Sequence, residues 1–140
     1  TAQRQGSRTN QANITVIIYN AEGNVVNETL TASDGTFSME VPAGGTYLVQ
    51  ASYTGYLKTK KADVVVESGT VDIGTTTLLG GDVNNDDNIN ILDVVTIINR
   101  FGTSGWSTVE STDINDDTQV NIFDLTIATG NFGNVGPVDW

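Results

Sequence analysis

One segment of 21 residues occurs twice in the second half of the chain, and this duplication constrains the fold more than any other feature. Residues 82–102 read DVNNDDNINILDVVTIINRFG and residues 113–133 read DINDDTQVNIFDLTIATGNFG, with eight of the 21 positions identical. The shared polar residues at loop positions 1, 3, 5, 9 and 12 are Asp82, Asn84, Asp86, Asn90 and Asp93, and Asp113, Asn115, Asp117, Asn121 and Asp124. Oxygen ligands at this spacing, with an apolar residue at position 8, let one short loop surround a hard cation such as calcium. The repeat therefore predicts two calcium-binding loops.

An apolar stripe at helical spacing follows each loop. The stripe residues are Val94, Ile97, Ile98 and Phe101 in the first copy, and Leu125, Ala128 and Phe132 in the second. Gly102 and Gly133 follow the last apolar residue, where a helix commonly ends in a left-handed residue. Because neither copy offers its stripe another partner, we expect the two helices to pack against each other in one small unit.

The doubled loop-and-helix pattern, with Phe-Gly closing both copies, resembles the dockerin family over residues 80–133. Dockerins are modules of secreted proteins that hold two calcium ions and bind cohesin modules on a partner. The resemblance implies a helical F-hand unit, two calcium ions per chain, a cohesin partner, and an extracellular or cell-surface protein of the kind used in polysaccharide degradation. It assigns the ten polar residues above as metal ligands, together with the backbone carbonyl groups of Asn88 and Gln119 at position 7.

The first departure from the family pattern lies at position 6 of the loops. The family usually has glycine there, because the backbone turns sharply with φ > 0. Here the position holds Asp87 in the first loop and Thr118 in the second. A β-branched residue adopts this region poorly, so we expect the second site to be the weaker or more distorted one.

The second departure concerns the residues expected to face a partner. Many cellulosomal dockerins carry Ser or Thr at positions 10 and 11, whereas this chain has apolar residues there in both copies. They are Ile91, Leu92, Ile122 and Phe123, and we assign them to a partner-binding face together with Ile98 and Asn99. Either this face docks a different class of cohesin, or the chain's own tail covers it.

The charge distribution agrees with metal loops. The net charge is −11, and residues 82–140 hold ten acidic side chains against one base, Arg100. A solvated acidic face is the alternative explanation, but only the metal hypothesis explains the regular spacing of the acids. The absence of a basic stripe argues against nucleic acid.

Residue types that are missing from the chain limit its chemistry. There is no Cys and no His, which removes thiol nucleophiles, disulfides and imidazole-dependent catalysis. A pair of carboxylates could still hydrolyse a glycosidic bond, but we predict that the chain is not an enzyme. No apolar run approaches the roughly 20 residues that span a bilayer. The opening TAQRQGSRTN suggests a fragment of a longer secreted protein, and we expect a monomer.

The first half of the chain consists of short alternating segments separated by turn signals. Alternation, with a turn every eight to twelve residues, predicts an antiparallel β-sandwich of the immunoglobulin or transthyretin type. The expected strands start with Ile14–Ile18, Val25–Thr31, Phe37–Val41 and Tyr47–Ala51, and Val64–Glu67 and Val71–Leu79 close the set. We therefore predict two domains, residues 1–79 and residues 80–140.

The run SDGTFSMEVPAGGTYLVQASYTGYL resembles the carboxypeptidase regulatory-like (transthyretin-like) domain over roughly residues 8–79. The residues that carry the resemblance are Asp34, Gly35, Phe37, Pro42, Gly44, Tyr47, Gly55 and Tyr56. The family's first strand would be Thr1–Arg8. The resemblance implies a spacer or prop without chemistry of its own, which is an analogy at the level of the fold.

Only Gly80 and Gly81 separate the last strand from the first ligand, so we expect the two domains to touch. This leaves two hypotheses for the function. The chain is a calcium-dependent docking module on a spacer, or it is a calcium-stiffened structural tail whose helical unit packs on its own β domain and binds no cohesin.

Four aromatic residues are ambiguous in the sequence. Tyr53 and Tyr56, near Lys58, could form a platform for a sugar or a peptide, although packing explains such residues more often. Trp106 is expected to cap the helical core rather than face a partner, and Trp140 to fold back over the start of the helical unit or over Leu78 and Leu79.

Overall fold

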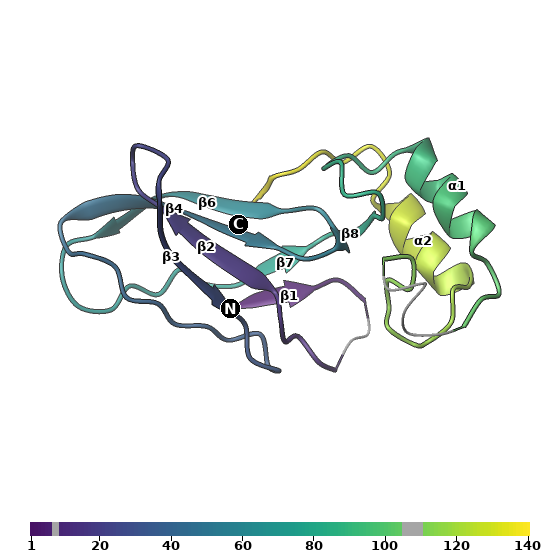
Figure 1. Cartoon of the computed structure of the whole chain (residues 1–140), viewed down its shortest axis with the longest axis horizontal. Coiled ribbons are helices and arrows are strands. Elements are labelled where there is room, and N and C mark those ends of the chain that lie inside the picture. The colour runs from purple at the N-terminus through teal and green to yellow at the C-terminus, as the bar shows by residue number, and fades with distance from the viewer. Residues whose placement is uncertain (7–8, 105–110) are drawn as a thin grey trace.

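A five-stranded sheet forms the centre of the N-terminal half of the protein. The computed structural model describes residues 1–6, 9–104 and 111–140. The order of the sheet is β3-β2-β4-β6-β9, with antiparallel pairs throughout except that β9 runs parallel to β6. The strands are β2 (Thr15–Tyr19), β3 (Val25–Leu30), β4 (Gly45–Ser52), β6 (Thr59–Val66) and β9 (Val138–Asp139). Figure 1 shows the strands occupying one end of an elongated molecule and the helices the other.

Two short strand pairs complete the β structure. The pair β1 (Ala2–Arg4) and β7 (Thr76–Leu78) is parallel, and the pair β5 (Gly55–Tyr56) and β8 (Gly80–Asp82) is antiparallel. β1 corresponds to the first half of the strand expected over residues 1–8. The N-terminal part is all-β as predicted, although two of its pairings are parallel rather than antiparallel.

Alternation of side chains creates the buried face of the main sheet. Val16 and Ile18 are buried on β2, and Tyr47, Val49 and Ala51 are buried on β4, while the residues between them are half-buried. This period of two follows from the pleat of a strand. The buried side chains form one hydrophobic core, to which each Val or Ile contributes about 1.5–3 kcal/mol.

The prediction of a strand over residues 37–41 was wrong. Phe37, Met39 and Val41 do pack against the core, but among the described residues this segment belongs to no sheet. It follows the expected turn, in which Asp34 Oδ1 accepts a hydrogen bond from Thr36 N at 2.9 Å. A segment that lies flat on a core buries every second side chain whether or not its backbone joins a ladder. Alternation in the sequence therefore could not separate the two cases.

Two helices of nine residues form the C-terminal unit, α1 (Ile91–Asn99) and α2 (Ile122–Gly130). Each helix begins with a capping box in which the N-cap side chain binds the helix backbone and the N3 carboxylate binds the N-cap backbone. The N-caps are Asn90 and Asn121, and the N3 residues are Asp93 and Asp124. Positions 9 and 12 of each predicted calcium loop are therefore also the residues that start its helix.

The predicted apolar stripes are only partly buried. Ile97 and Ala128 are fully buried, but Ala128 lies directly against Gly81, so α2 packs on β8 as well as on α1. The prediction was wrong for Ile98, Phe101 and Phe132, whose side chains are exposed. Residues from the loops fill the core instead: Val83, Ile89, Ile114 and Val120 are all buried.

The two units are packed tightly together, which confirms the expected contact. β5 of the first unit pairs with β8, the strand that opens the first loop. A Cβ atom on Gly80 would lie 2.5 Å from Ile114 Cγ2, so any larger residue would force its neighbours to shift. The Tyr56 hydroxyl donates to the backbone oxygen of Ile114 in the second loop. The β5–β8 pair, both loops and α2 therefore meet at one boundary.

A polar contact near the N-terminus reinforces this boundary. Gln5 Oε1 accepts hydrogen bonds from Gly80 N at 3.1 Å and from Asn131 Nδ2 at 2.5 Å. Asn131 Nδ2 also donates to Gly80 O at 2.7 Å. Because Asn131 follows α2 directly, these bonds attach the end of that helix to the β domain.

The C-terminal tail returns to the main sheet. It passes the first loop, where Gly136 N donates to Asp87 O at 2.8 Å, and then pairs with β6 through Val138 N and Trp140 N. Trp140 forms a T-shaped ring pair with Phe37, with ring centroids 6.0 Å apart, and it packs against the hydrophobic core that includes Leu78. Trp106 lies outside the described residues. Within the described part of the chain, no helix is both long and apolar enough to cross a membrane.

Candidate metal centres and the exposed helix face

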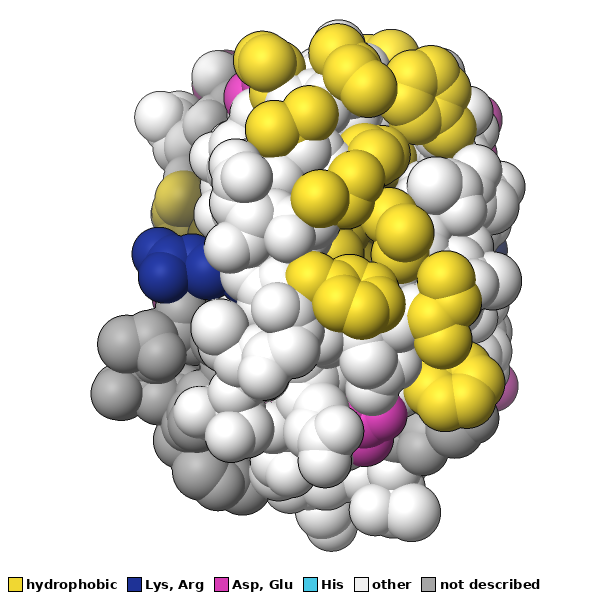
Figure 2. Space-filling view, turned by 90° about the vertical axis from the view of Figure 1, so that its right-hand side faces the viewer, with side chains coloured by type: hydrophobic (Ala, Val, Ile, Leu, Met, Phe, Trp, Pro, Cys, Tyr) yellow, Lys and Arg dark blue, Asp and Glu magenta, His cyan; other side chains and the backbone are white. Residues whose placement is uncertain are grey.

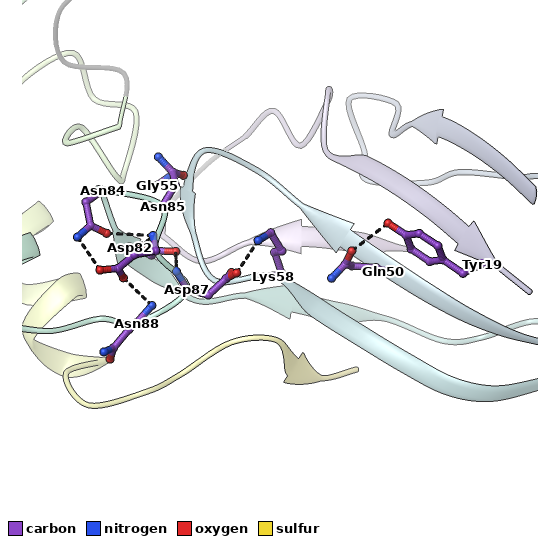
Figure 3. Close-up of polar contacts among 10 residues, drawn as sticks. Tyr19, Gln50, Gly55, Lys58, Asp82, Asn84, Asn85, Asp87 and Asn88 are labelled. Atoms are coloured by element: carbon purple, nitrogen blue, oxygen red, sulfur yellow. Dashed lines mark hydrogen bonds and ion pairs between the residues drawn. The ribbon is translucent and has the colours of Figure 1, made fainter. Parts of the chain in front are cut away.

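Asp82 is the organising residue of the first loop. Its carboxylate is buried, and it accepts hydrogen bonds from Asp86 N and Asp87 N, each at 3.0 Å. Asp86 in turn accepts from Asn84 Nδ2 at 2.9 Å and from Asn88 N at 3.0 Å. Figure 3 shows these side chains wrapped around the turn. The loop therefore already has a closed conformation in which oxygen atoms from several positions lie close together.

Asp93 closes the first loop from the helix. It is fully buried, and it accepts from Asn84 N at 3.3 Å and from Asn90 N at 2.9 Å. Asn90 caps α1 through a bond from Leu92 N to Asn90 Oδ1 at 2.8 Å. The side-chain oxygen of this predicted ligand is thus already engaged as a helix cap. A position-9 residue often reaches the ion through water, which would leave the cap intact.

The second loop repeats the main contacts of this arrangement. Asp113 accepts from Asp117 N at 3.2 Å and from Thr118 N at 2.9 Å. Asp124 accepts from Ile114 N at 2.7 Å and Asn121 N at 2.9 Å, and it is fully buried. Asn121 caps α2 as Asn90 caps α1. The sequence duplication is therefore also a duplication of geometry.

Position 6 adopts the left-handed backbone in both loops, as the pattern predicts. The φ angle is 61° at Asp87 and 74° at Thr118. The cost of this region for a residue other than glycine is about 1–3 kcal/mol. Asp tolerates the conformation better than a β-branched residue does, so the strain is concentrated at Thr118.

Electrostatics favour a bound cation in both loops. Burial raises the pKa of Asp82, and the charges of Asp93 and Asp86 raise that pKa further. Burial likewise raises the pKa of Asp113, and the charge of Asp124 adds to the effect. A cation would relieve both causes, because it neutralises the buried charge and offsets the repulsion between carboxylates.

The donor atoms are all oxygens, which suits calcium and not a soft metal. In the part of the chain that the structure describes, no three acidic side chains are grouped so that they alone could hold a metal ion. Each candidate centre therefore depends on Asn side chains and on backbone carbonyl groups in addition to its carboxylates. This mixed set fits a hard cation with six to eight oxygen ligands.

The first loop is attached to the β domain by contacts that the sequence did not predict. Gly55 N donates to Asn85 Oδ1 at 3.0 Å, and Lys58 Nζ donates to Asp87 Oδ2 at 2.5 Å (Figure 3). The signal that could have suggested the second contact is an acid at position 6, where the family pattern has glycine.

The partner-binding residues assigned from the sequence lie on an open surface. Ile91, Leu92, Ile122 and Phe123 are 59%, 60%, 55% and 63% exposed, and Ile98 and Asn99 are exposed as well. The sequence assignment missed further exposed apolar side chains of this unit, namely Val95, Phe101, Phe132 and Val135. Figure 2 shows hydrophobic side chains gathered in a band across the helical end of the molecule. We call the eight residues Ile91, Leu92, Val95, Ile98, Phe101, Ile122, Phe123 and Phe132 the apolar helix face.

Comparisons with known proteins agree with both halves of this architecture. The model of the carboxypeptidase regulatory-like domain matches residues 4–78, and the model of the dockerin type I domain matches residues 80–131. The comparison with curated proteins gave no match. The fold and the paired loops therefore define a two-part module of a kind that is not catalytic. The chain belongs to the carboxypeptidase regulatory-like domain family and continues into a dockerin type I domain, which confirms both resemblances.

Two similar solved structures contain the same succession of folds. One is an N-terminal interface mutant of a type II cohesin–X–dockerin complex from Acetivibrio cellulolyticus, with 25% identity and a TM-score of 0.79. That match covers 96% of this chain and 93% of the other. A C-terminal interface mutant of the complex has 24% identity and a TM-score of 0.76, with 96% and 94% coverage, and it supports the fold alone.

Proposed function

We propose that this chain is a calcium-dependent docking module that binds a cohesin through the apolar helix face. The observation that carries the proposal is the exposure of Ile91, Leu92, Ile122 and Phe123, which are the first two residues of the two helices. Apolar side chains that gather on one surface of a soluble domain commonly mark a protein interface. The structural-tail hypothesis requires the same four residues to be buried against the β domain.

Calcium would act on this face through the helix starts. Asp93 and Asp124 are both the last predicted ligand of a loop and the N3 residue of a helix. An ion held by the loop therefore fixes the first turn of the helix, and with it the directions of the side chains that follow the cap. Without the ion, the acidic residues of each loop repel one another and the start of the helix loses rigidity.

We assign one calcium ion to each loop. The first ion would contact Asp82, Asn84, Asp86, Asp93 and the backbone oxygen of Asn88, with Asn90 reached through water. The second would contact Asp113, Asn115, Asp117, Asp124 and the backbone oxygen of Gln119, with Asn121 again reached through water. The strain at Thr118 makes the second site the weaker of the two.

The partner proposed here is a cohesin whose receiving surface is apolar. The A. cellulolyticus complex is named as type II, and the family match of residues 80–131 is to the type I model. The apolar residues at positions 10 and 11 favour a partner whose contact surface consists of hydrophobic side chains rather than hydrogen-bonding groups. The β domain, residues 1–79, acts as a prop for residues 80–140. Millimolar extracellular calcium would keep such sites filled outside a cell, which is the location that we propose.

The test is binding of the full chain to immobilised type II cohesin, in calcium and in chelator. The proposal requires binding in calcium and its loss on chelation and in Asp82→Ala. Leu92→Asp and Phe123→Asp should each weaken binding at least tenfold, because a charge would have to be buried in the interface. Val25→Asp is the matched control, since Val25 is 58% exposed but lies on β3 of the β domain. Binding that survives chelation, or that Val25→Asp weakens as much as Leu92→Asp does, would contradict the proposal.

A further inference from the structure

A cavity of about 520 Å³ is lined by residues of the β domain and of the first loop, and none of its lining residues belongs to the apolar helix face. Thr15 begins β2, Ser52 ends β4, Tyr53 and Thr54 follow β4, and the lining also includes Lys58 and Asp87. Thr15 and Ser52 are register partners on neighbouring strands, so their side chains share one face of the sheet. The volume falls within the range of about 300–1,000 Å³ that is usual for small-molecule sites.

The described charged groups in the wall are one cation, Lys58, and two carboxylates, Asp82 and Asp87. Lys58 Nζ lies 2.5 Å from Asp87 Oδ2, so the cation is already paired (Figure 3). The Asp82 carboxylate, which also borders the cavity, accepts two backbone bonds within its own loop. The described residues of the wall therefore offer no unpaired cation to an anionic ligand such as a phosphate or a carboxylate.

The remaining polar groups are hydroxyls and amides. The hydroxyls belong to Thr15, Ser52 and Thr54, and the amides to Asn13 and Asn85. The bond from Gly55 N to Asn85 Oδ1 fixes the orientation of one amide. Hydroxyl and amide groups can both donate and accept hydrogen bonds, which matches a ligand that itself carries many hydroxyls.

Tyr53 gives the cavity a rigid aromatic wall. The Arg4 guanidinium lies over one face of the Tyr53 ring, with its central carbon 4.0 Å from the ring centroid, and the Tyr53 and Tyr56 rings form a T-shaped pair with centroids 5.9 Å apart. Contacts on these sides hold the ring in place before any ligand arrives, so little side-chain entropy remains to be lost on binding. An aromatic ring that borders a polar cavity can cover the C–H face of a sugar while the hydroxyls of the sugar reach the polar groups.

We propose that this cavity binds a neutral sugar unit of a polysaccharide. The juxtaposition that carries the proposal is the fixed Tyr53 ring beside the hydroxyl groups of Thr15, Ser52 and Thr54, in a wall where Lys58, the only cation among the described lining residues, is paired. The site would give the β domain a binding activity of its own, separate from docking. Because no cohesin takes part, failure of this site leaves the docking proposal standing, and the reverse also holds.

The experiment is an NMR titration of the ¹⁵N-labelled full chain in calcium buffer with cellobiose, xylobiose and maltose. At least one of these disaccharides should shift the backbone amides of residues 13–15 and 52–58 in a saturable manner. Two variants test the cavity. Tyr53→Ala removes the aromatic ring, and Ser52→Gln places a larger side chain in the cavity while Tyr53 itself is unchanged. Each should weaken binding at least tenfold. Tyr19→Ala is the control, because Tyr19 lies on β2 and bonds to Gln50 outside the cavity wall.

Three results would overturn the proposal. In the first, none of the three disaccharides produces localised, saturable shifts. In the second, Ser52→Gln binds as tightly as the unaltered chain, which would place any sugar elsewhere even if Tyr53→Ala abolished binding. In the third, galacturonic acid binds more tightly than the neutral sugars do, which would contradict the argument from the paired cation.

Discussion

Lys58 Nζ of the β domain lies 2.5 Å from Asp87 Oδ2, at the position of the first loop where the dockerin pattern has glycine. A carboxylate at this position therefore joins the loop to the neighbouring domain. In the second loop the same left-handed position holds Thr118, which has no charge with which to make such a pair. The two loops share one backbone geometry but differ in how they are attached to the rest of the molecule.

Substitution of glycine at position 6 should change the free energy of unfolding differently in the two loops. Thr118→Gly removes a β-branched residue from a φ of 74°, and it should raise the free energy of unfolding by about 1 kcal/mol. Asp87→Gly relieves less strain and removes a partly exposed ion pair, so it should be neutral or lose about 1 kcal/mol. Urea unfolding of both variants in chelator measures the two changes. Equal stabilisation by the two substitutions would show that the Lys58 pair contributes nothing.

The fit of Gly80 between the two units leads to a second prediction. A Cβ atom there would lie 2.5 Å from Ile114 Cγ2 and 3.1 Å from Ile127 Cγ2. Gly80→Ala should therefore lower the free energy of unfolding by about 1–3 kcal/mol through overpacking. Gly130→Ala is the control within α2, because a Cβ atom there meets nothing within 4 Å. This control should gain about 0.5–1 kcal/mol. A neutral Gly80→Ala in thermal melts would mean that the boundary is looser than the contacts indicate.

Buried Asp82 should make the calcium-free protein sensitive to pH in an unusual direction. Burial raises its pKa above the ordinary value of 3.8, so the folded chain holds this proton more tightly than the unfolded chain does. In chelator, the penalty for ionising Asp82 is absent well below 3.8 and complete above the raised pKa. As the pH falls through this window, the unaltered chain should therefore gain stability relative to Asp82→Asn.

Calcium should reverse this dependence. The ion binds only the ionised carboxylate, so the rise in melting temperature on adding calcium should shrink as the pH falls through the same window. Melts of both proteins across acidic pH, in chelator and in calcium, measure the two effects. A gap between the proteins that stays constant with pH in chelator would show that Asp82 is not the group responsible.

The parts of this molecule that sequence reasoning predicted are those encoded locally. The conformation at positions 1, 6 and 12 of each loop is determined by nearby residues. Asp82 and Asp93, for example, accept hydrogen bonds from backbone groups only a few residues away. The errors concern long-range neighbours. Ile98 and Phe101 have the spacing of core residues, but spacing alone cannot say which side of a helix will be covered. The Lys58–Asp87 pair joins residues 29 apart in the chain, and although the acid at position 6 is unusual, nothing in the local sequence identifies Lys58 as its partner.

Trp140 anchors the returning tail, which gives a further prediction. Its ring meets Phe37 edge-on, and its backbone N–H donates to Lys60 O at 2.7 Å. Trp140→Ala keeps the backbone bond but removes the ring, and it should lower the free energy of unfolding by about 1–3 kcal/mol. Val135→Ala, at an exposed position of the same tail, should change it by less than about 0.5 kcal/mol. Similar losses in both variants under chemical denaturation would argue against a specific role for the ring.

The most direct test of the account is a calorimetric titration of the full chain with calcium, run beside Asp113→Ala. The account predicts one binding event for each loop and the loss of only the second-loop event in Asp113→Ala. It also predicts a rise in melting temperature with calcium, since binding to the folded state adds about 2.7 kcal/mol when the free ion is 100-fold above its dissociation constant. An absence of calcium-dependent heat, together with melting temperatures that are equal in calcium and in chelator, would contradict the claim that these loops are calcium sites controlling a docking face.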